Sequence, residues 1–307
     1  MSFAVSQATP EDWAASCRLL SQRSLAPARV GAARRYRDLL ASGTIDPAGL
    51  FIARDEYSQV QGAMLVQVQP GALGLAWPPH VNSGRDHVAL EDALVAAACN
   101  WLRSRGVKVC QAFGPAGNRG AMAPLARHGL RFVTQLTFLR RTFGDSAAFP
   151  TGGGVLHFDR VGPGNAAAFV ATLLATYDGS RDCPEATGSR TQDELVQGLG
   201  QSAGDEPARW FLVFQDRNPV GVVLLDDAVE ASETELTYLG LIPRTRGHGW
   251  SHELVRFAMQ LAAASPSRAL TVSVDLRNEP ALRLYLHHDF LEFDRQDVFL
   301  ASWPGSS

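Results

Sequence analysis

Residues 235–250 of the sequence read E-L-T-Y-L-G-L-I-P-R-T-R-G-H-G-W. The first eight residues mix leucine, β-branched and aromatic side chains, which predicts a buried strand. Pro243 follows them and ends the strand, because proline has no backbone N–H to donate. Beyond the G-H-G segment, apolar residues recur at helical spacing from Leu254 to Leu261. We therefore expect a strand that turns through a glycine loop into the start of a helix.

A strand, a glycine loop and a helix start in this order are typical of an anion site. The first N–H groups of a helix have no partner inside the helix, and Gly247 and Gly249 would let a phosphate approach the backbone closely. Arg244 and Arg246 are expected to face the same space. The spacing R-x-x-G-x-G resembles the pyrophosphate loop of the GNAT acyltransferase superfamily, whose members hold acetyl-coenzyme A there. This segment lacks the Gly-Lys-Ser/Thr ending of the phosphate-binding loop of nucleoside triphosphatases.

A second stretch, residues 278–290, reads N-E-P-A-L-R-L-Y-L-H-H-D-F. Asn278 and Pro280 suit the first positions of a short helix. The stretch resembles the second GNAT motif, in which the asparagine touches the pantetheine arm and the tyrosine protonates the departing thiolate. Asp289 stands where that family usually has glycine, at a turn that aspartate tolerates.

The resemblance implies which residues bind acetyl-CoA, the co-substrate, and which act in catalysis. The implied cofactor contacts are Leu239, Leu241, Ile242, Arg244, Arg246, Gly247, His248, Gly249, Trp250, Ser251, Asn278 and Ala281. Tyr285 is implied as the acid and Glu235 as the general base, and the strand is expected to splay at 239–241 so that an N–H near Leu241 meets the thioester oxygen. Tyr285 also fits a core aromatic residue, and Glu235 a solvated strand residue.

In the same family, the first helices and their loop line the acceptor pocket, which here means residues 177–190. The candidate acceptor-binding residues in this stretch are Tyr177, Asp182, Glu185 and Arg190. Asp182 or Glu185 suits an amine, and Arg181 or Arg190 suits a carboxylate. An ordinary polar loop is the competing interpretation. The expected acceptor is a primary amine of a small molecule or peptide.

The composition narrows the class of protein. The chain has 307 residues, 46% of them hydrophobic, with a net charge of −3 and no dense basic stripe, so we expect neither nucleic acid nor a membrane surface as a partner. Its four cysteines lie far apart and no histidine has partners at ligand spacing, so no metal site is expected. The N-terminus has neither a basic start nor an apolar run, which favours a cytoplasmic location. The sequence is compatible with a homodimer and does not determine the oligomeric state.

The sequence repeats itself with an offset of 160 residues. Leu94, Asn118 and His128 correspond to Leu254, Asn278 and His288. We predict an α/β (α+β) fold of two tandem GNAT-like domains, each a mixed, mostly antiparallel sheet flanked by helices. The domains span residues 1–147 and 148–307, with a flexible joint within the glycine-rich residues 144–154.

The first domain is predicted to be degenerate, structural or substrate-shaping. Its residues 84–89, G-R-D-H-V-A, lack the second glycine and place Asp86 in the phosphate space, and Leu125 stands in the place of Tyr285. The catalytic domain is expected to transfer an acetyl group directly from acetyl-CoA to the amine in a ternary complex. A non-catalytic acyl-CoA sensor and a tandem acetyltransferase of the mycothiol-synthase type are the alternatives.

Overall fold

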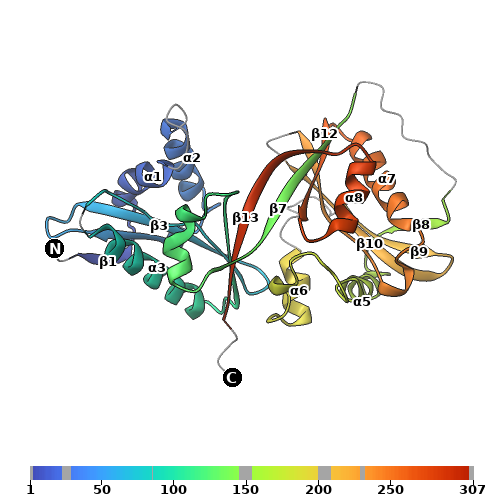
Figure 1. The fold of residues 1–307 in the computed structure, drawn as a ribbon, viewed down its shortest axis with the longest axis horizontal. Helices are drawn as coiled ribbons and strands as arrows, with labels where there is room; N and C mark the ends of the chain where they lie inside the picture. The colour runs from blue at the N-terminus through green and yellow to red at the C-terminus, as the bar shows by residue number, and fades with distance from the viewer. Residues whose placement is uncertain are drawn as a thin grey trace. The chain divides into compact units, whose positions relative to one another are not determined.

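The computed structural model describes residues 3–22, 29–84, 86–144, 154–199, 209–228 and 232–303 (Figure 1). The chain forms two compact units. The first unit contains residues 1–133, 185–198 and 297–307, and the second contains residues 134–184 and 199–296.

The first unit is built on a sheet in the order β1-β2-β3-β4-β6, with β5 paired to β3. All neighbouring strands in this sheet are antiparallel except β4 and β6, which are parallel. Helix α3 packs its apolar side against β2 and β3. The elements are β1 (Ala4–Gln7), α1 (Trp13–Ser21), α2 (Arg29–Ala41), β2 (Leu50–Arg54), β3 (Val60–Gln69), β4 (Leu73–Ala76), β5 (His80–Val81), α3 (His87–Ser104), β6 (Val109–Pro115), α4 (Ala123–Arg127) and α6 (Gln192–Leu199).

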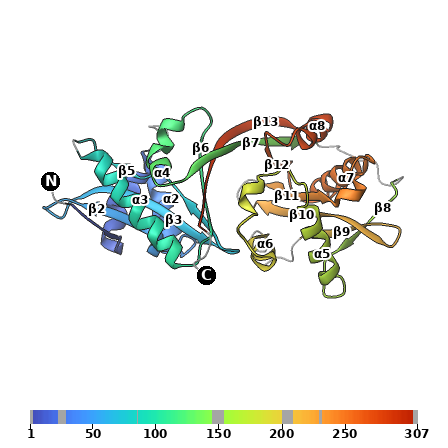
Figure 2. The same cartoon turned by 60° about the horizontal axis from the view of Figure 1, so that its bottom comes forward.

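The second unit has a sheet in the order β8-β9-β10-β11-β12-β7. Here too the strands are antiparallel except for one pair, β11 and β12. Helices α5 and α7 both pack on β10 and β11, and they lie on opposite sides of the sheet (Figure 2). The elements are β7 (Arg131–Thr142), β8 (Leu156–Arg160), α5 (Ala166–Thr176), β9 (Arg209–Gln215), β10 (Asn218–Ala228), β11 (Glu233–Leu241), α7 (Trp250–Ala263), β12 (Ala269–Asp275), α8 (Glu279–His287) and β13 (Leu291–Ser302).

The structure confirms the tandem repeat and its offset. Strands β6 and β12 begin and end 160 residues apart, and so do β7 and β13. Leu94 and Val95 of α3 are fully buried, as are Leu254 and Val255 of α7. The same apolar positions therefore form the core of both repeats, and the predicted fold class is confirmed.

The two units do not have the same boundaries as the two predicted domains. The predicted joint falls almost entirely on residues 145–153, which lie outside the described residues. Residues 134–142 of β7 belong to the second unit, where β7 pairs with β12 from Ala269↔Thr142 to Asp275↔Leu136. Residues 297–307, which include the end of β13, belong to the first unit. The last strand of each repeat thus contributes residues to the unit of the other repeat.

Candidate functional site

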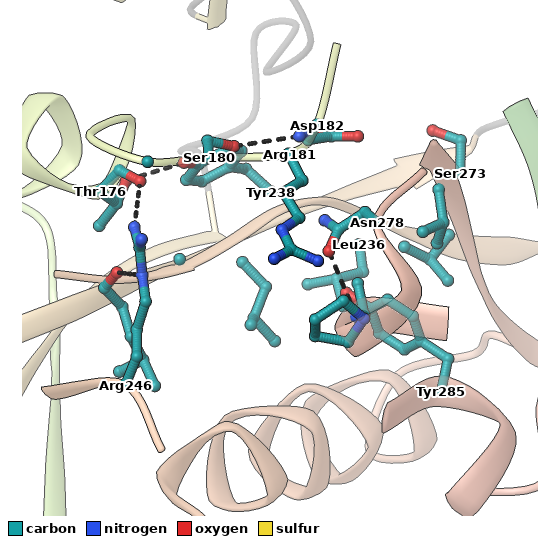
Figure 3. Close-up of a pocket in the computed structure, with 18 of the residues that line it drawn as sticks. Thr176, Ser180, Arg181, Asp182, Leu236, Tyr238, Arg246, Ser273, Asn278 and Tyr285 are labelled. Carbon is teal, nitrogen blue, oxygen red and sulfur yellow. Dashed lines mark hydrogen bonds between the residues drawn. The ribbon is translucent and has the colours of Figure 1, made fainter. Parts of the chain in front are cut away.

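The candidate site lies in the second unit, where β11 and β12 part. Their parallel pairing consists of Thr234↔Leu270 and Glu235↔Thr271, and the rest of β11 continues beside β10 as far as Leu241↔Gly221. The diverging strands leave a cavity of about 490 Å³, which we call the wedge cavity (Figure 3). Residues 236–241 line one side of it and residues 272–274 the other. The strands separate from Leu236 onward, before the expected residues 239–241.

A β-bulge lies where the strands begin to separate. The register of β10 against β11 shifts between Leu224 and Leu225, so that Thr237 is the extra residue. A bulge reverses the alternation of side chains along a strand. Leu236 therefore packs into the core that includes α7, whereas Tyr238 hydrogen-bonds Thr176 of α5 on the other side of the sheet.

The open edge of β11 presents backbone donors to the wedge cavity. In an antiparallel ladder, successive residues point their N–H groups to alternate sides. Ile242 donates its N–H to Val220 O of the β10 side at 3.0 Å. The N–H groups of Leu239 and Leu241 therefore point away from β10, toward the cavity.

The glycine loop ends in an anion-binding arrangement. Gly247 and Gly249 have φ values of 82° and 77°, in the left-handed region that favours glycine, and Gly249 caps α7. Within the described residues, the N–H groups of residues 247–251 have no acceptor. Five successive unpaired donors at a helix start form a site for a phosphate or diphosphate. Gly247 itself lines the wedge cavity.

The two loop arginines do not face the same space, which corrects the expectation from sequence. Arg246 lines the wedge cavity, whereas Arg244 lines a separate cavity of about 420 Å³ beside α5. The guanidinium of Arg246 donates to Leu241 O at 3.0 Å and to Thr176 O at 2.9 Å. Thr176 is the last residue of α5, and the final carbonyls of a helix lack partners within the helix. Arg246 therefore fastens the glycine loop to α5 and β11.

Helix α8 forms the floor of the wedge cavity. Asn278 caps this helix as predicted, because its side chain accepts from the N–H of Ala281 at 3.4 Å, and both residues line the cavity. Tyr285 also lines the cavity and is 5% exposed. Burial raises the pKa of Tyr285 above its ordinary value, and Asp182 and Tyr238 raise it further, so the hydroxyl keeps its proton at neutral pH. Asp289 has a φ of 57°, in the left-handed region that favours glycine and that aspartate tolerates.

A buried carboxylate holds the predicted acceptor loop. Asp275, at the end of β12, is fully buried and accepts from Thr134 Oγ1 at 2.6 Å, from Arg277 Nη2 at 2.7 Å and from the N–H of Cys183 at 3.0 Å. The N–H of Asp275 donates to Asp182 Oδ1 at 3.4 Å. Asp182 lines the wedge cavity together with Arg181, and burial raises the pKa of its carboxyl group.

The other predicted acceptor residues do not line the wedge cavity. Tyr177 packs its ring 5.5 Å from that of Tyr238 and does not line the wedge cavity. Glu185 and Arg190 belong to the first unit, where Arg190 Nε donates to Ala186 O at 2.9 Å. Of the four candidates, Asp182 alone lines the wedge cavity.

Glu235 lies at the closed end of the wedge, in the last residue pair between β11 and β12. It is not one of the residues that line the cavity. Asp226 is its partner across the ladder to β10. Partial burial of the carboxyl group, followed by the charge of Asp226, raises the pKa of Glu235 above its usual range. The base role implied for Glu235 stays a prediction.

The remaining predicted cofactor residues surround the glycine loop. The His248 ring approaches Arg246 O through Nδ1 at 3.1 Å and lies 5.2 Å from the Trp250 ring. Trp250 and Ser251 begin α7, so their backbone groups belong to the anion site. Ile242 is buried and lines the cavity that contains Arg244.

Sequence reasoning missed a polar contact on the α5 side of the cavity. The Tyr238 hydroxyl lies 2.8 Å from Thr176 Oγ1, and both residues line the wedge cavity. A Cβ atom on Gly240 would lie 2.8 Å from the Cβ of Thr176, so glycine is required for α5 to approach β11. A glycine inside an apolar strand was the available signal, since it often marks a close approach of another chain segment.

The described part of the chain contains no group of three or more histidine, cysteine, aspartate or glutamate residues arranged to hold a metal ion. None of the helices described is long and apolar enough to cross a membrane.

Part of the chain matches a known protein family. Residues 173–290 match the model of the acetyltransferase (GNAT) family. No curated protein matches the sequence significantly.

Solved structures share the fold over nearly the whole chain. A GCN5-related N-acetyltransferase from Sphaerobacter thermophilus has 19% identity and a TM-score of 0.64, with 99% of this chain and 97% of that chain covered. A tandem GNAT protein from the clavulanic acid biosynthesis pathway has 16% identity and a TM-score of 0.56, with 100% of both chains covered. A glucosamine N-acetyltransferase region of a fungal multi-domain β-N-acetylglucosaminidase has 15% identity and a TM-score of 0.66, with 98% of this chain and 38% of that chain covered. At these identities, the likeness concerns the fold.

The clamp formed by Arg246 can be tested by Arg246→Lys. Lysine has a single nitrogen and cannot span the two carbonyl groups as a planar guanidinium does. We expect the hydrogen-bonded backbone amides of Ile242, Thr245 and Arg246 to exchange about 2- to 10-fold faster with deuterium, which corresponds to the loss of about one hydrogen bond. Arg244→Lys, two residues away and outside the clamp, is the matched control and should leave exchange unchanged. Equal exchange in the two variants would contradict the clamp.

Proposed function

We propose that the second unit is an acyl-CoA-dependent N-acetyltransferase acting on a primary amine, because residues 173–290 match the model of the acetyltransferase (GNAT) family. The observation that carries the proposal is the wedge cavity, which joins three kinds of group in one space. Gly247 begins the row of unpaired N–H groups, Tyr285 offers a buried hydroxyl, and Asp182 offers a carboxylate on the acceptor side. A thioester donor, a leaving thiolate and an amine need groups of these three kinds.

The residues present fit the chemistry of coenzyme A. Its diphosphate is a doubly charged anion, which suits the donors of residues 247–251 at the positive end of the α7 dipole. Its pantetheine arm carries amide groups and no charge. The open edge of β11, with the N–H groups of Leu239 and Leu241, suits an extended amide chain that adds to a sheet edge.

The reaction places a distinct demand on each of these residues. Acetyl-CoA, when bound, supplies a thioester whose carbon–sulfur bond breaks as a carbon–nitrogen bond to the amine forms, so the amine loses one proton and the thiol product gains one. Tyr285 holds a proton that its raised pKa retains at neutral pH, so its hydroxyl can donate to the departing sulfur. The N–H of Leu241 provides a fixed donor for the carbonyl oxygen.

Two carboxylates are available to receive the proton of the amine. Asp182 lines the wedge cavity, and Glu235 lies at its closed end outside the lining. Glu235 would therefore act through water, and its raised pKa brings it closer to neutral pH, where a base is most effective. Asp182 suits the orientation of the amine.

We assign no transfer chemistry to the first repeat. Leu125 is fully buried where the second repeat has Tyr285, and it has no proton to give. Asp86 is the residue that caps α3, where a carboxylate opposes a phosphate. One molecule of CoA for each chain is the expected stoichiometry.

Gly249→Val tests the proposed CoA site. A β-branched residue at a φ of 77° is strained by about 1–3 kcal/mol, and relief of that strain would disturb the row of donors. We expect calorimetric titration with CoA to give one site in the wild type and at least about tenfold weaker binding in the variant, equal to about 1.4 kcal/mol. Gly117→Val introduces the same side chain at a φ of 79° outside the site and should bind CoA normally. Absence of CoA binding by the wild-type protein would refute the proposed function.

Tyr285→Phe tests the acid. The substitution keeps the ring and its packing on Phe290, whose centroid lies 5.4 Å away, and removes only the hydroxyl. We expect kcat to fall about 100-fold or more. The Kd of CoA should change by less than about twofold, because the loss is confined to the chemical step. Since burial raises the pKa of Tyr285, the wild-type rate should show no alkaline decline between neutral pH and about pH 10, the ordinary tyrosine value. Unchanged turnover in the variant would exclude the acid role.

Glu235→Gln tests the base. As the pH falls through the pKa of Glu235, which lies above its usual value, the carboxylate gains a proton and can no longer accept one from the amine. With kcat/KM expressed per concentration of unprotonated amine, the wild type should therefore lose activity at acidic pH, and the variant should lack this dependence and turn over about 100-fold more slowly. Glu233→Gln, two residues earlier in β11, should retain the wild-type profile. If Glu235→Gln still lost kcat/KM at acidic pH, the general base would be another residue.

A further inference from the structure

The charged side chains that line the wedge cavity are Arg181, Asp182 and Arg246. Arg246 is engaged, because its guanidinium donates to Leu241 O and Thr176 O. Arg181 and Asp182 are left as a cation and an anion on successive residues. A site with one charge of each sign is suited to a ligand that carries both charges.

Arg181 extends into the cavity. Figure 3 shows its guanidinium descending from the loop above the cavity toward Asn278. Within the described residues, this guanidinium has no ion pair and no hydrogen bond. An arginine fork has five donors, and a carboxylate is the partner that it can bind through two parallel hydrogen bonds.

The proposed cofactor does not account for this cation. The diphosphate is assigned to residues 247–251 at the start of α7, and the pantetheine arm beside Asn278 has no charge. The 3′-phosphate of coenzyme A belongs to the adenosine part, on the other side of the diphosphate from the pantetheine arm. The guanidinium of Arg181 is therefore available to the second substrate.

The backbone that carries the two residues is held on both sides. The N–H of Asp182 donates to Ser180 Oγ at 3.2 Å, and the N–H of Cys183 donates to the buried Asp275 at 3.0 Å. The carboxylate of Asp182 is also held, since its Oδ1 accepts from the N–H of Asp275. A carboxylate with one oxygen so engaged still offers its other oxygen to an ammonium or amine group.

We propose that the acceptor is a small amine that also carries a carboxylate, such as an amino acid, with the carboxylate bound by Arg181 and the amine directed by Asp182. This inference rests on the proposed function and names the acceptor class of the same site. It gives Arg181 a role in specificity that requires no contact with the cofactor.

The test compares amino acids with their amides, which keep the amine and lose the carboxylate. Release of CoA from acetyl-CoA is measured for each pair, and kcat/KM is expressed per concentration of unprotonated amine, because amidation lowers the pKa of the amine. We expect at least about a tenfold preference for the free acid, the size of one charge-assisted contact of about 1.5–3 kcal/mol. Arg181→Gln should abolish the preference by raising KM for the acid and not for acetyl-CoA, and Arg181→Lys should restore part of it. Arg283→Gln, on the exposed surface of α8, is the control and should behave as wild type.

Several outcomes would overturn the inference while CoA still binds in calorimetry. These are equal use of acid and amide, turnover of neither, a preference that survives in Arg181→Gln, and an effect of Arg181→Gln confined to the KM of acetyl-CoA. Failure to bind CoA is the separate result that would refute the proposed function itself.

Discussion

The end of the parallel pairing at Glu235↔Thr271 is the constraint on which the site depends. Two strands that part inside a protein leave backbone groups that must find other partners, because an unpaired buried N–H or C=O is costly. The C=O of Leu241 is satisfied by Arg246. The N–H groups of Leu239 and Leu241 point into the cavity, so the same divergence that creates the space also provides it with donors. The bulge at Thr237 permits this arrangement, since it lets Tyr238 contact α5 while Leu236 stays in the core.

Asp275 is the second fixed point, and its role follows from its burial. A buried carboxylate is tolerated when donors surround it, and Asp275 receives hydrogen bonds from Thr134, Arg277 and Cys183. One of these donors, the N–H of Cys183, is on the acceptor loop. The hydrogen bond that helps to stabilise the buried carboxylate of Asp275 therefore also fixes the loop beside the cavity. The corresponding residue of the first repeat, 160 positions earlier, is Pro115. Proline has neither a carboxylate nor an N–H, so the first repeat cannot hold a loop in this way.

Local patterns in the sequence predicted the local parts of the site. The strand, the glycine loop, the start of α7 and the Asn278 cap each depend on neighbouring residues, and all are present. The partner of Arg246 could not be predicted, because Thr176 is 70 residues away and the approach of α5 depends on Gly240. The sequence also did not predict that β7 and β13 contribute residues to the unit of the other repeat. Repeats that share their apolar positions present equivalent strand edges, so the sequence does not determine which copy a strand joins.

The two repeats also show how an anion site is lost without loss of the fold. Helix α7 begins at Trp250, which corresponds to position 90, but α3 begins at His87, three residues earlier. Those three positions correspond to residues 247–249, so helix replaces the glycine loop in the first repeat. The extension leaves the buried face of α3 intact, as Leu94 and Val95 keep the positions of Leu254 and Val255. Because the core residues lie beyond the first turn, the start of the helix is free to change, and replacement of the loop glycines removes the site at little cost to packing.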